Sequence, residues 1–248
     1  MKKLVKALAA LMLMTAVIFA AGCGKDDDSN NNDGDDNGGG TFNPEYVDLG
    51  LPSGTLWATC NLGATTPEGN GDYFAWGETE TKTTYGWSTY KYGKGTSWED
   101  PQLTKYCSKS DYGYNGFTDT LTVLLPSDDA ATANWGSGWY MPTADQWSEL
   151  MNNTNITCTT QNGVNGRLFT ASNGNTLFLP AAGYRYDDEL NFVGSYGGYW
   201  SSSLPTDYPG HGWYFHFFSG VLAVDYIFDI SDRSYGHPVR PVRSASQN

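Results

Sequence analysis

Basic side chains and histidines are scarce in this chain. Its 248 residues include 14 Lys and Arg against 27 Asp and Glu, and only three histidines, which are His211, His216 and His237. The formal net charge is −13 at pH 7, and within residues 41–248 no stretch gathers lysines or arginines into a cluster. Proteins that bind nucleic acid or an anionic lipid surface depend on such a cluster. We therefore expect neither class of partner.

Motifs for catalysis and for metal binding are equally scarce. No Cys-x-x-Cys pair or Cys/His cluster has the spacing of a metal site, and no Gly-x-Ser-x-Gly elbow surrounds the serines at 201–203. Only His211 lies in a predicted loop where a base would be accessible. The acidic runs 128–129 and 187–189 are explained by a helix start and a solvated turn. We predict no enzyme, cofactor or metal, although a glycosidase carboxylate pair could be assembled from many positions.

Cysteines are few as well. Three of the four, Cys60, Cys107 and Cys158, lie in the part of the chain that is expected to fold. An exported domain meets oxidising conditions, so one disulfide plus one thiol is one option, and three small buried side chains are the other. If a bridge forms, we expect it to join Cys60 to Cys158, because both lie beside predicted strands whereas Cys107 lies in a polar loop.

The apolar stretch at residues 7–21 is shorter than the roughly 20 residues that a helix needs to span a bilayer. It follows a basic start and ends in small residues at 20–22, directly before Cys23. This layout resembles the lipobox of bacterial lipoproteins, which implies that residues 1–22 are a signal peptide and that Cys23 is the lipid-attachment residue, carrying acyl chains such as palmitate. An ordinary secretory signal and an uncleaved membrane anchor are the alternatives, and the short apolar stretch disfavours the anchor.

A polar tract follows Cys23. Residues 25–40 include six Asp, four Asn and four Gly and no aromatic residue, so we predict that residues 23–44 are a lipidated cysteine followed by a disordered acidic linker. Its start, Lys25-Asp26-Asp27-Asp28, resembles the surface-export signal of Bacteroidetes lipoproteins. The expected location is the outer membrane, lipid-anchored and facing the cell exterior. A merely solvating linker is the alternative.

The remaining chain combines many glycines and aromatics with few periodic runs of helical length. Two helices are predicted, one over 126–133 with Ser127 as its cap, and one that starts from the capping box Thr143-x-x-Gln146. The segment 78–119 reads as a long ordered loop. Helices in the first half and hairpins in the second indicate an α+β fold.

The second half is rich in hairpin signals. Asn173-Gly174 separates the predicted strands 166–170 and 176–179. Residues 213–218 are expected to pair with 221–225 across Ser219-Gly220, with aromatic side chains on both faces of the strand. The last predicted strand covers 237–243.

Six ordered segments carry a family resemblance. They are 47–58, 73–78, 139–143, 179–185, 199–203 and 239–242. Together they resemble the Fibrobacter succinogenes major paralogous domain, which is similar in fold to C-type lectin-like domains and distantly related to formylglycine-generating enzymes. The resemblance covers residues 45–243, followed by a tail at 244–248. It implies a single α+β domain with two helices, short antiparallel strands, long ordered loops and chain ends that meet in a sheet, and it implies no activity.

The chain departs from these relatives in two ways. The tripeptides Glu-Pro-Asn, Gln-Pro-Asp and Trp-Asn-Asp that serve calcium-dependent sugar binding in C-type lectins do not occur. Formylglycine-generating enzymes need cysteines late in the domain, and none follows Cys158. Neither calcium-dependent binding nor that reaction is expected.

Recognition is the predicted function. Aromatic residues in loops offer large contact faces at low entropy cost, so the ligand-binding candidates are Trp87, Trp98, Tyr208, His211 and Trp213, with Tyr90 and Tyr92 beside them. The alternative is that these side chains anchor loops to the core, as is expected of Trp57, Trp76, Trp139, Trp147 and Trp200. The expected partner is a glycan or a protein, and the competing hypothesis is a structural component of the cell envelope without small-ligand binding.

Overall fold

The computed structural model describes residues 44–220 and 226–245. The predicted signal peptide 1–22, the lipid-attachment residue Cys23, the linker up to residue 43, residues 221–225 and the last three residues of the tail lie outside this part. Within the described residues no helix combines the length and the apolar character that a membrane span requires.

The described residues form two α-helices and thirteen strands, which confirms the α+β class. The helices are α1 (Ala130–Trp135) and α2 (Ala144–Asn153). Every strand pairing in the described part is antiparallel. The strands form five small sheets. Three sheets have three strands each: β1 (Tyr46–Asp48), β2 (Thr55–Ala58) and β13 (Val242–Ser244); β9 (Tyr196–Trp200), β10 (His211–Phe218) and β11 (Tyr226–Asp232); and β4 (Thr154–Gln161), β5 (Val164–Ala171) and β6 (Thr176–Pro180). Two sheets have two strands each: β3 (Tyr73–Phe74) with β12 (His237–Pro238), and β7 (Tyr184–Tyr186) with β8 (Glu189–Asn191).

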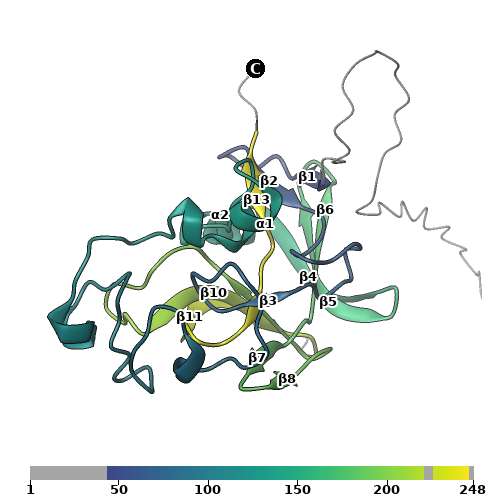
Figure 1. Cartoon of the computed structure of the whole chain (residues 1–248). Coiled ribbons are helices and arrows are strands. Elements are labelled where there is room, and N and C mark those ends of the chain that lie inside the picture. Colours follow the sequence, from purple (N-terminus) through teal and green to yellow (C-terminus); the bar gives the residue numbers. More distant parts are fainter. Residues whose placement is uncertain (1–43, 221–225, 246–248) are drawn as a thin grey trace, which may run out of the picture.

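The first and last strands of the domain meet in one sheet. β1 and β13 flank β2, so that Val47 and Val242 both pair with Trp57, whose side chain is fully buried. Figure 1 shows this sheet at the upper end of the domain, and the β7–β8 hairpin at the opposite end. The chain therefore enters and leaves the fold at one end, as the resemblance implied.

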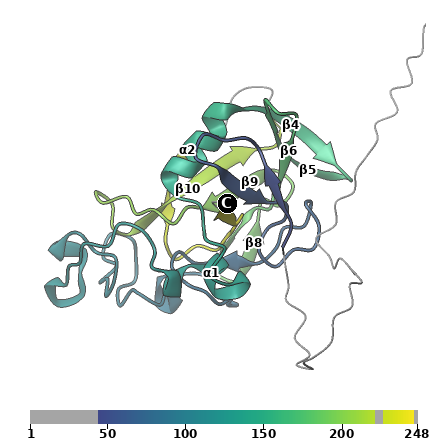
Figure 2. The same ribbon diagram turned by 90° about the horizontal axis from the view of Figure 1, so that it is seen from above.

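Helix α2 packs against both this terminal sheet and the β9–β10–β11 sheet. Its predicted capping box is present, because the side chain of Thr143 accepts from Gln146 N and the side chain of Gln146 accepts from Thr143 N. The buried face presents Trp147, whose ring lies 4.8 Å from that of Trp57 and stacks on Phe215 at 5.0 Å. Figure 2, in which the domain is seen from above, places α2 beside β10. All five tryptophans predicted for the core are buried.

The start of α1 differs from the prediction. A 3₁₀ turn covers Pro126–Asp128, and the helix is capped by Asp129, whose Oδ1 accepts from Thr132 N at 3.0 Å, rather than by Ser127. Asp128 is buried, and its carboxylate accepts from Lys105, Tyr92 and Tyr106 in the long loop. These contacts hold residue 128 outside the helix, so the helix starts later than its sequence indicated.

Two hairpin predictions have different outcomes. β5 and β6 pair as expected across Asn173-Gly174, where Gly174 has φ +87°. β10 pairs with β11, with Phe217 opposite Tyr226, whereas the predicted partner segment 221–225 lies outside the described residues. The seven residues of β11 form the outer strand of the β9–β10–β11 sheet.

The predicted last strand, 237–243, is interrupted. β12 pairs with β3 and β13 pairs with β2, because Pro238 and Pro241 lack the N–H that a continuous ladder needs. Between them the fully buried Arg240 donates from Nε to Asn61 Oδ1 at 2.8 Å and from Nη1 to Thr59 O at 2.7 Å. This side chain fastens the C-terminal segment to the chain that follows β2.

The predicted bridge between Cys60 and Cys158 does not form in the structure. Cys60 is fully buried directly after β2, whereas Cys158 is an exposed thiol in β4. β4 lies at the edge of its sheet, and its side chain at 158 faces solvent rather than the core. Cys158 therefore points away from the core in which Cys60 lies.

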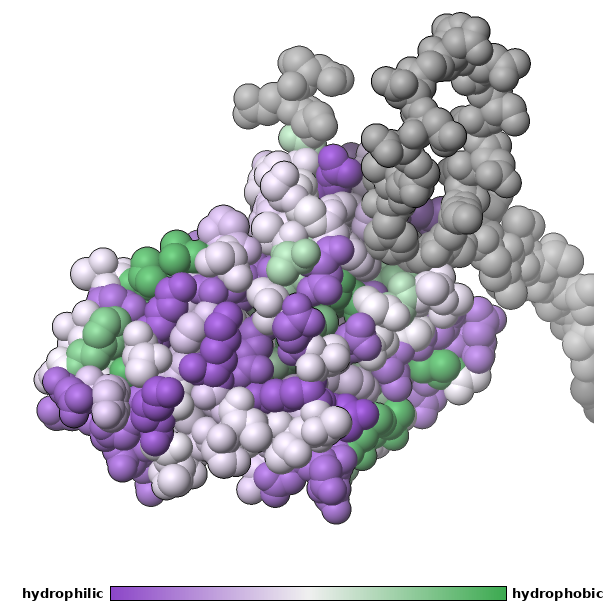
Figure 3. Space-filling view, in the orientation of Figure 1, coloured by the Kyte–Doolittle hydropathy of each residue, from purple (hydrophilic) through white to green (hydrophobic). Residues whose placement is uncertain are grey.

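The loop region between β3 and α1 is ordered by aromatic packing. It occupies the lower left of Figure 1, coloured blue to teal, and holds Tyr90, Tyr92 and Tyr106 in the core. The ring of Tyr106 lies 5.1 Å from Trp76 and 5.9 Å from Tyr92. Tyr90 and Tyr92 are thus anchors, as the alternative reading of the sequence held. Figure 3 shows that the outer surface on this side is mostly hydrophilic, with a few small hydrophobic patches.

Candidate functional site

A polar groove of about 380 Å³ lies where three distant segments meet. The loop 86–98 forms one wall, the β7–β8 hairpin forms a second, and residues 232–235 after β11 form the third. The side chains that matter most are Trp87, Trp98, Tyr186, Asp187, Asp232 and Tyr235. We call this feature the acidic groove.

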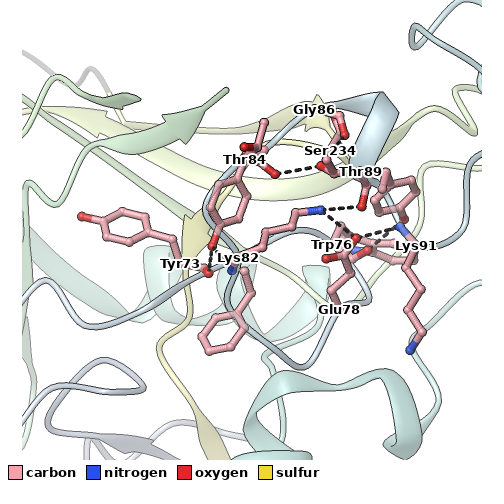
Figure 4. A network of polar contacts seen from close by, with 12 residues as sticks. Tyr73, Trp76, Glu78, Lys82, Thr84, Gly86, Thr89, Lys91 and Ser234 are labelled. Atoms are coloured by element: carbon pink, nitrogen blue, oxygen red, sulfur yellow. Dashed lines mark hydrogen bonds and ion pairs between the residues drawn. The ribbon is translucent and has the colours of Figure 1, made fainter. Parts of the chain in front are cut away.

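The loop wall is held by a polar network at its base. The nearly buried Glu78 accepts from Lys82 Nζ at 2.9 Å and from Lys91 N at 2.8 Å, and Lys82 also donates to Thr89 O at 3.2 Å (Figure 4). These contacts close the loop around the short 3₁₀ helix Trp87–Thr89. The position of Trp87 in the groove therefore depends on an ion pair beneath it.

The hairpin wall is joined to the loop through the backbone. Tyr85 N donates to Asp187 O and Asp187 N donates to Tyr85 O, each at 2.7 Å. Asp187 has φ +51°, a conformation that an aspartate tolerates better than most residues. Its carboxylate is exposed and makes no hydrogen bond within the part of the chain that the structure describes. It is available to a ligand.

The third wall carries the second carboxylate of the groove. Asp232 Oδ2 accepts from the indole Nε1 of Trp87 at 2.9 Å, and its Oδ1 accepts from the backbone and hydroxyl of Ser234 at 2.9 and 2.7 Å. Asp232 thus orients Trp87 while contributing negative charge. Trp87 itself is largely buried, so only part of its ring faces the groove.

Trp98 brings together the two sets of aromatic candidates that the sequence separated. Its side chain is 44% exposed, and its ring lies 5.2 Å from His211, which lies 6.3 Å from Tyr208. Gly210 allows this approach, because a Cβ at that position would lie 2.6 Å from the carbonyl oxygen of Trp98. Burial lowers the pKa of His211 below its usual value, so the ring is neutral at pH 7.

The candidate Trp213 faces a different depression. This depression, of about 510 Å³, is separate from the acidic groove and is lined by Tyr208, Trp213, Asp229 and the residues around Pro205. Trp213 is half-buried and stacks on Phe228 at 5.0 Å. It therefore serves packing of the β10–β11 hairpin as well as the surface.

A second cavity, of about 310 Å³, adjoins the acidic groove. Tyr235 lines both, and the other aromatic walls of the cavity are Tyr184, Phe192, Tyr196, Tyr214 and Phe218. Tyr184 stacks on Tyr235 and on Phe192, with ring centroids 5.8 and 5.9 Å apart. We call this feature the aromatic cavity.

The polar groups of the aromatic cavity are neutral. His237 is fully buried, and burial lowers its pKa to about 3. Burial also raises the pKa of Tyr196 and of Tyr214, and raises that of Tyr235 to about 12. Tyr196 donates its hydroxyl to Tyr214 at 3.2 Å. At pH 7 the cavity walls carry no charge of their own.

Ser231 and His237 form a hydroxyl–imidazole pair in the wall of this cavity, with Oγ and Nε2 2.9 Å apart. An imidazole whose pKa is about 3 is a weak base, and no described carboxylate contacts its Nδ1, which has no hydrogen-bond partner in the described structure. A nucleophilic serine needs both a competent base and a group that orients it. The pair therefore does not favour covalent catalysis.

Metal binding finds no support in the arrangement of side chains either. Among residues 44–220 and 226–245, no three His, Cys, Asp or Glu side chains gather as ligands would. The two acidic runs considered from the sequence are separated, since Asp129 caps α1 and Asp187 lies in the acidic groove.

Sequence reasoning missed Tyr186, Asp187, Asp232 and Tyr235 in the groove and the walls of the aromatic cavity. The predicted solvated turn at 187–189 is confirmed, since it joins β7 to β8 and is exposed, but the sequence did not indicate its place in the groove or the strand β11. The sequence held one indication of the aromatic cavity. Aromatic side chains on both faces of 213–218 indicate that each face of that strand is either packed against another element or available to a ligand. Tyr214 and Phe218 occupy the face that lines the cavity.

No protein-family model, curated protein or solved structure matches this chain. The resemblance to the Fibrobacter succinogenes domain therefore stays a prediction.

Proposed function

We propose that this protein is a lipid-anchored recognition protein whose lectin-like domain binds a glycan in the acidic groove. The observation that carries the proposal is that the exposed indole of Trp98, the exposed phenol of Tyr186 and the open carboxylate of Asp187 line the same groove. An aromatic face packs against the apolar face of a sugar ring, and a carboxylate accepts hydrogen bonds from its hydroxyls.

The charge of the groove selects among glycans. Asp187 and Asp232 line it, and Asp188 and Glu189 follow on the same hairpin. No lysine or arginine is among the described residues that line it. A sialylated, uronic or sulfated glycan would bring like charge to this surface, so the proposal is for a neutral glycan.

The position at which the predicted linker joins the domain suits this role. A coil of the length predicted for the linker has a typical reach of roughly 20–25 Å. β1 lies at the end of the domain opposite the β7–β8 hairpin (Figure 1), so a chain anchored through Cys23 would present the acidic groove away from the membrane. This arrangement supports recognition of material outside the cell.

A glycan array with the full-length protein purified in detergent tests the proposal. Binding is expected to neutral glycans and not to their sialylated or sulfated counterparts, and Trp98→Ala is expected to weaken it at least tenfold. Tyr114→Ala removes an equally exposed aromatic side chain outside the groove and serves as the control. Silence across the array would instead support the structural envelope component, and unchanged binding by Trp98→Ala would refute this groove as the site.

A further inference from the structure

The aromatic cavity is not explained by glycan binding in the neighbouring groove. Its six aromatic walls come from separate parts of the fold: Tyr184 from β7, Phe192 after β8, Tyr196 from β9, Tyr214 and Phe218 from β10, and Tyr235 after β11. A feature assembled from so many elements needs the whole fold to form. It is a candidate binding site in its own right.

Two of these walls are open to solvent. Phe192 is 61% exposed and Phe218 is 46% exposed, although each lies beside a buried or half-buried tyrosine ring. Leu190 in β8 and Val193 just after it are exposed as well. Figure 3 shows a hydrophobic patch at the lower right, where the β7–β8 hairpin lies. A ring that only filled the core would be covered. These phenylalanines stand where a ligand would enter.

Two pairs of hydrogen-bonding groups inside already bond to each other. Ser231 Oγ is paired with His237 Nε2, and the hydroxyl of Tyr196 is paired with that of Tyr214. His237 Nδ1, which has no partner in the described structure, lies against Gly198, since a Cβ there would be 2.8 Å from it. A ligand that needs many hydrogen bonds is therefore poorly served, and the cavity offers ring faces instead.

Those ring faces carry negative potential, and the charges around them have the same sign. Asp229 lies opposite Tyr214 in the β10–β11 register, and Asp187 and Asp232 lie in the groove beyond Tyr235. The lining residues include no Lys or Arg, and His237 is neutral. A cation over an aromatic face gains most where no other positive charge competes.

Arg185, on the same strand as the cavity wall Tyr184, is turned away from the cavity. Arg185 alternates with Tyr184 and Tyr186 in β7, and its guanidinium lies over the ring of Tyr73, 5.4 Å from the centroid. Since β-strand side chains point alternately to opposite faces, Arg185 occupies the face opposite the cavity walls. It does not supply a positive charge to the cavity.

We propose that the aromatic cavity binds an organic cation, specifically the quaternary ammonium group of a small molecule such as choline. The juxtaposition of six aromatic rings with flanking carboxylates and without a charged lining residue carries this inference. A quaternary ammonium has no N–H to satisfy, which suits walls made mainly of aromatic ring faces, whereas a primary ammonium would lose its hydrogen bonds to water. The site is independent of glycan binding in the acidic groove.

Calorimetric titration of the full-length protein with choline tests this proposal. The matched ligand is 3,3-dimethylbutan-1-ol, which has the same shape without the charge. Choline is expected to bind at least tenfold more tightly than this alcohol and than ethanolamine. Equal affinity for the alcohol, or no heat of binding with choline at millimolar concentration, would overturn the proposal.

Variants of Phe192 and Phe218, the two solvent-exposed walls at the mouth of the cavity, locate the site. Phe218→Ala and Phe192→Leu are expected to weaken choline binding at least fivefold, and the leucine keeps apolar contact with Tyr184 while removing the π face, so binding of the alcohol should be unchanged. Tyr114→Ala is the control for the loss of an exposed ring elsewhere. Choline binding that survives both mouth variants would refute this location. The titration uses no sugar, so a silent glycan array leaves its outcome unaffected.

Discussion

The indole Nε1 of Trp87 donates to Asp232 Oδ2 at 2.9 Å and joins two segments that are 145 residues apart. Through this bond the loop after β3 and the chain after β11 form one groove. Trp87 is largely buried, whereas Trp98, eleven residues later, is 44% exposed. In the proposed site Trp87 is thus a positioning residue and Trp98 is a contact surface.

Trp87→Phe should destabilise the fold by about 1.5–3 kcal/mol, because it removes a hydrogen bond to an ionised acceptor and leaves Asp232 with fewer donors. Urea unfolding followed by circular dichroism measures the change. Trp98→Phe, which alters an exposed ring, should change the free energy of unfolding by less than about 0.5 kcal/mol. Equal effects of the two substitutions would contradict the assigned roles.

Features defined within a few residues could be predicted from the sequence. The capping box of Thr143 and Gln146 and the turn at Asn173-Gly174 involve atoms that are close along the chain, and both are present. Asp128 shows the limit, because its partners Tyr92, Lys105 and Tyr106 are 36, 23 and 22 residues away. A helix start that depends on such partners looks the same in sequence as one that does not.

The site shows the same limit. The loop aromatics could be identified from the sequence, but the place of Trp87 depends on its bond to the distant Asp232, and the ring of Trp98 lies beside the distant His211. Tyr186 and Tyr235 join the groove only because the backbone of Asp187 pairs with Tyr85 and β11 pairs with β10. Pairings between distant strands are set by the whole core, and a local pattern does not contain them.

Asp128→Asn should destabilise the protein by at least about 2 kcal/mol, since the carboxylate accepts from Tyr92 and Tyr106, both at 2.6 Å, and from Lys105. Burial alone would raise the pKa of Asp128, but these donors outweigh it and lower the pKa. The stabilisation is therefore present above pH 3.8 and is lost as the pH falls further. Thermal unfolding at pH 7 measures the loss, with Asp111→Asn, an exposed carboxylate of the same loop region, as the control.

Cys23→Ser should release the protein from the membrane, because the substitution removes the thiol that the predicted acylation requires. Fractionation of cells is expected to recover the wild-type protein with the outer membrane and the variant in the soluble fraction. Proteinase K added to intact cells should digest the wild-type domain while a periplasmic marker protein survives. A domain that stays protected until the cells are lysed would contradict display on the exterior.

The protein should lose stability when the pH falls below 6.5, because His237 is held neutral in the fold. Burial lowers its pKa from 6.5 to about 3, so between these values the unfolded chain binds a proton that the folded chain does not. The expected loss from this residue is about 1.4 kcal/mol for each pH unit, and burial lowers the pKa of His211 and His216 in the same direction. Urea unfolding at pH 5.5 and 4.5 measures the slope, which His237→Gln should reduce by about that amount. A variant slope equal to that of the wild type would show that His237 takes up its proton in the folded state, and the aromatic cavity would then be positively charged at mildly acidic pH.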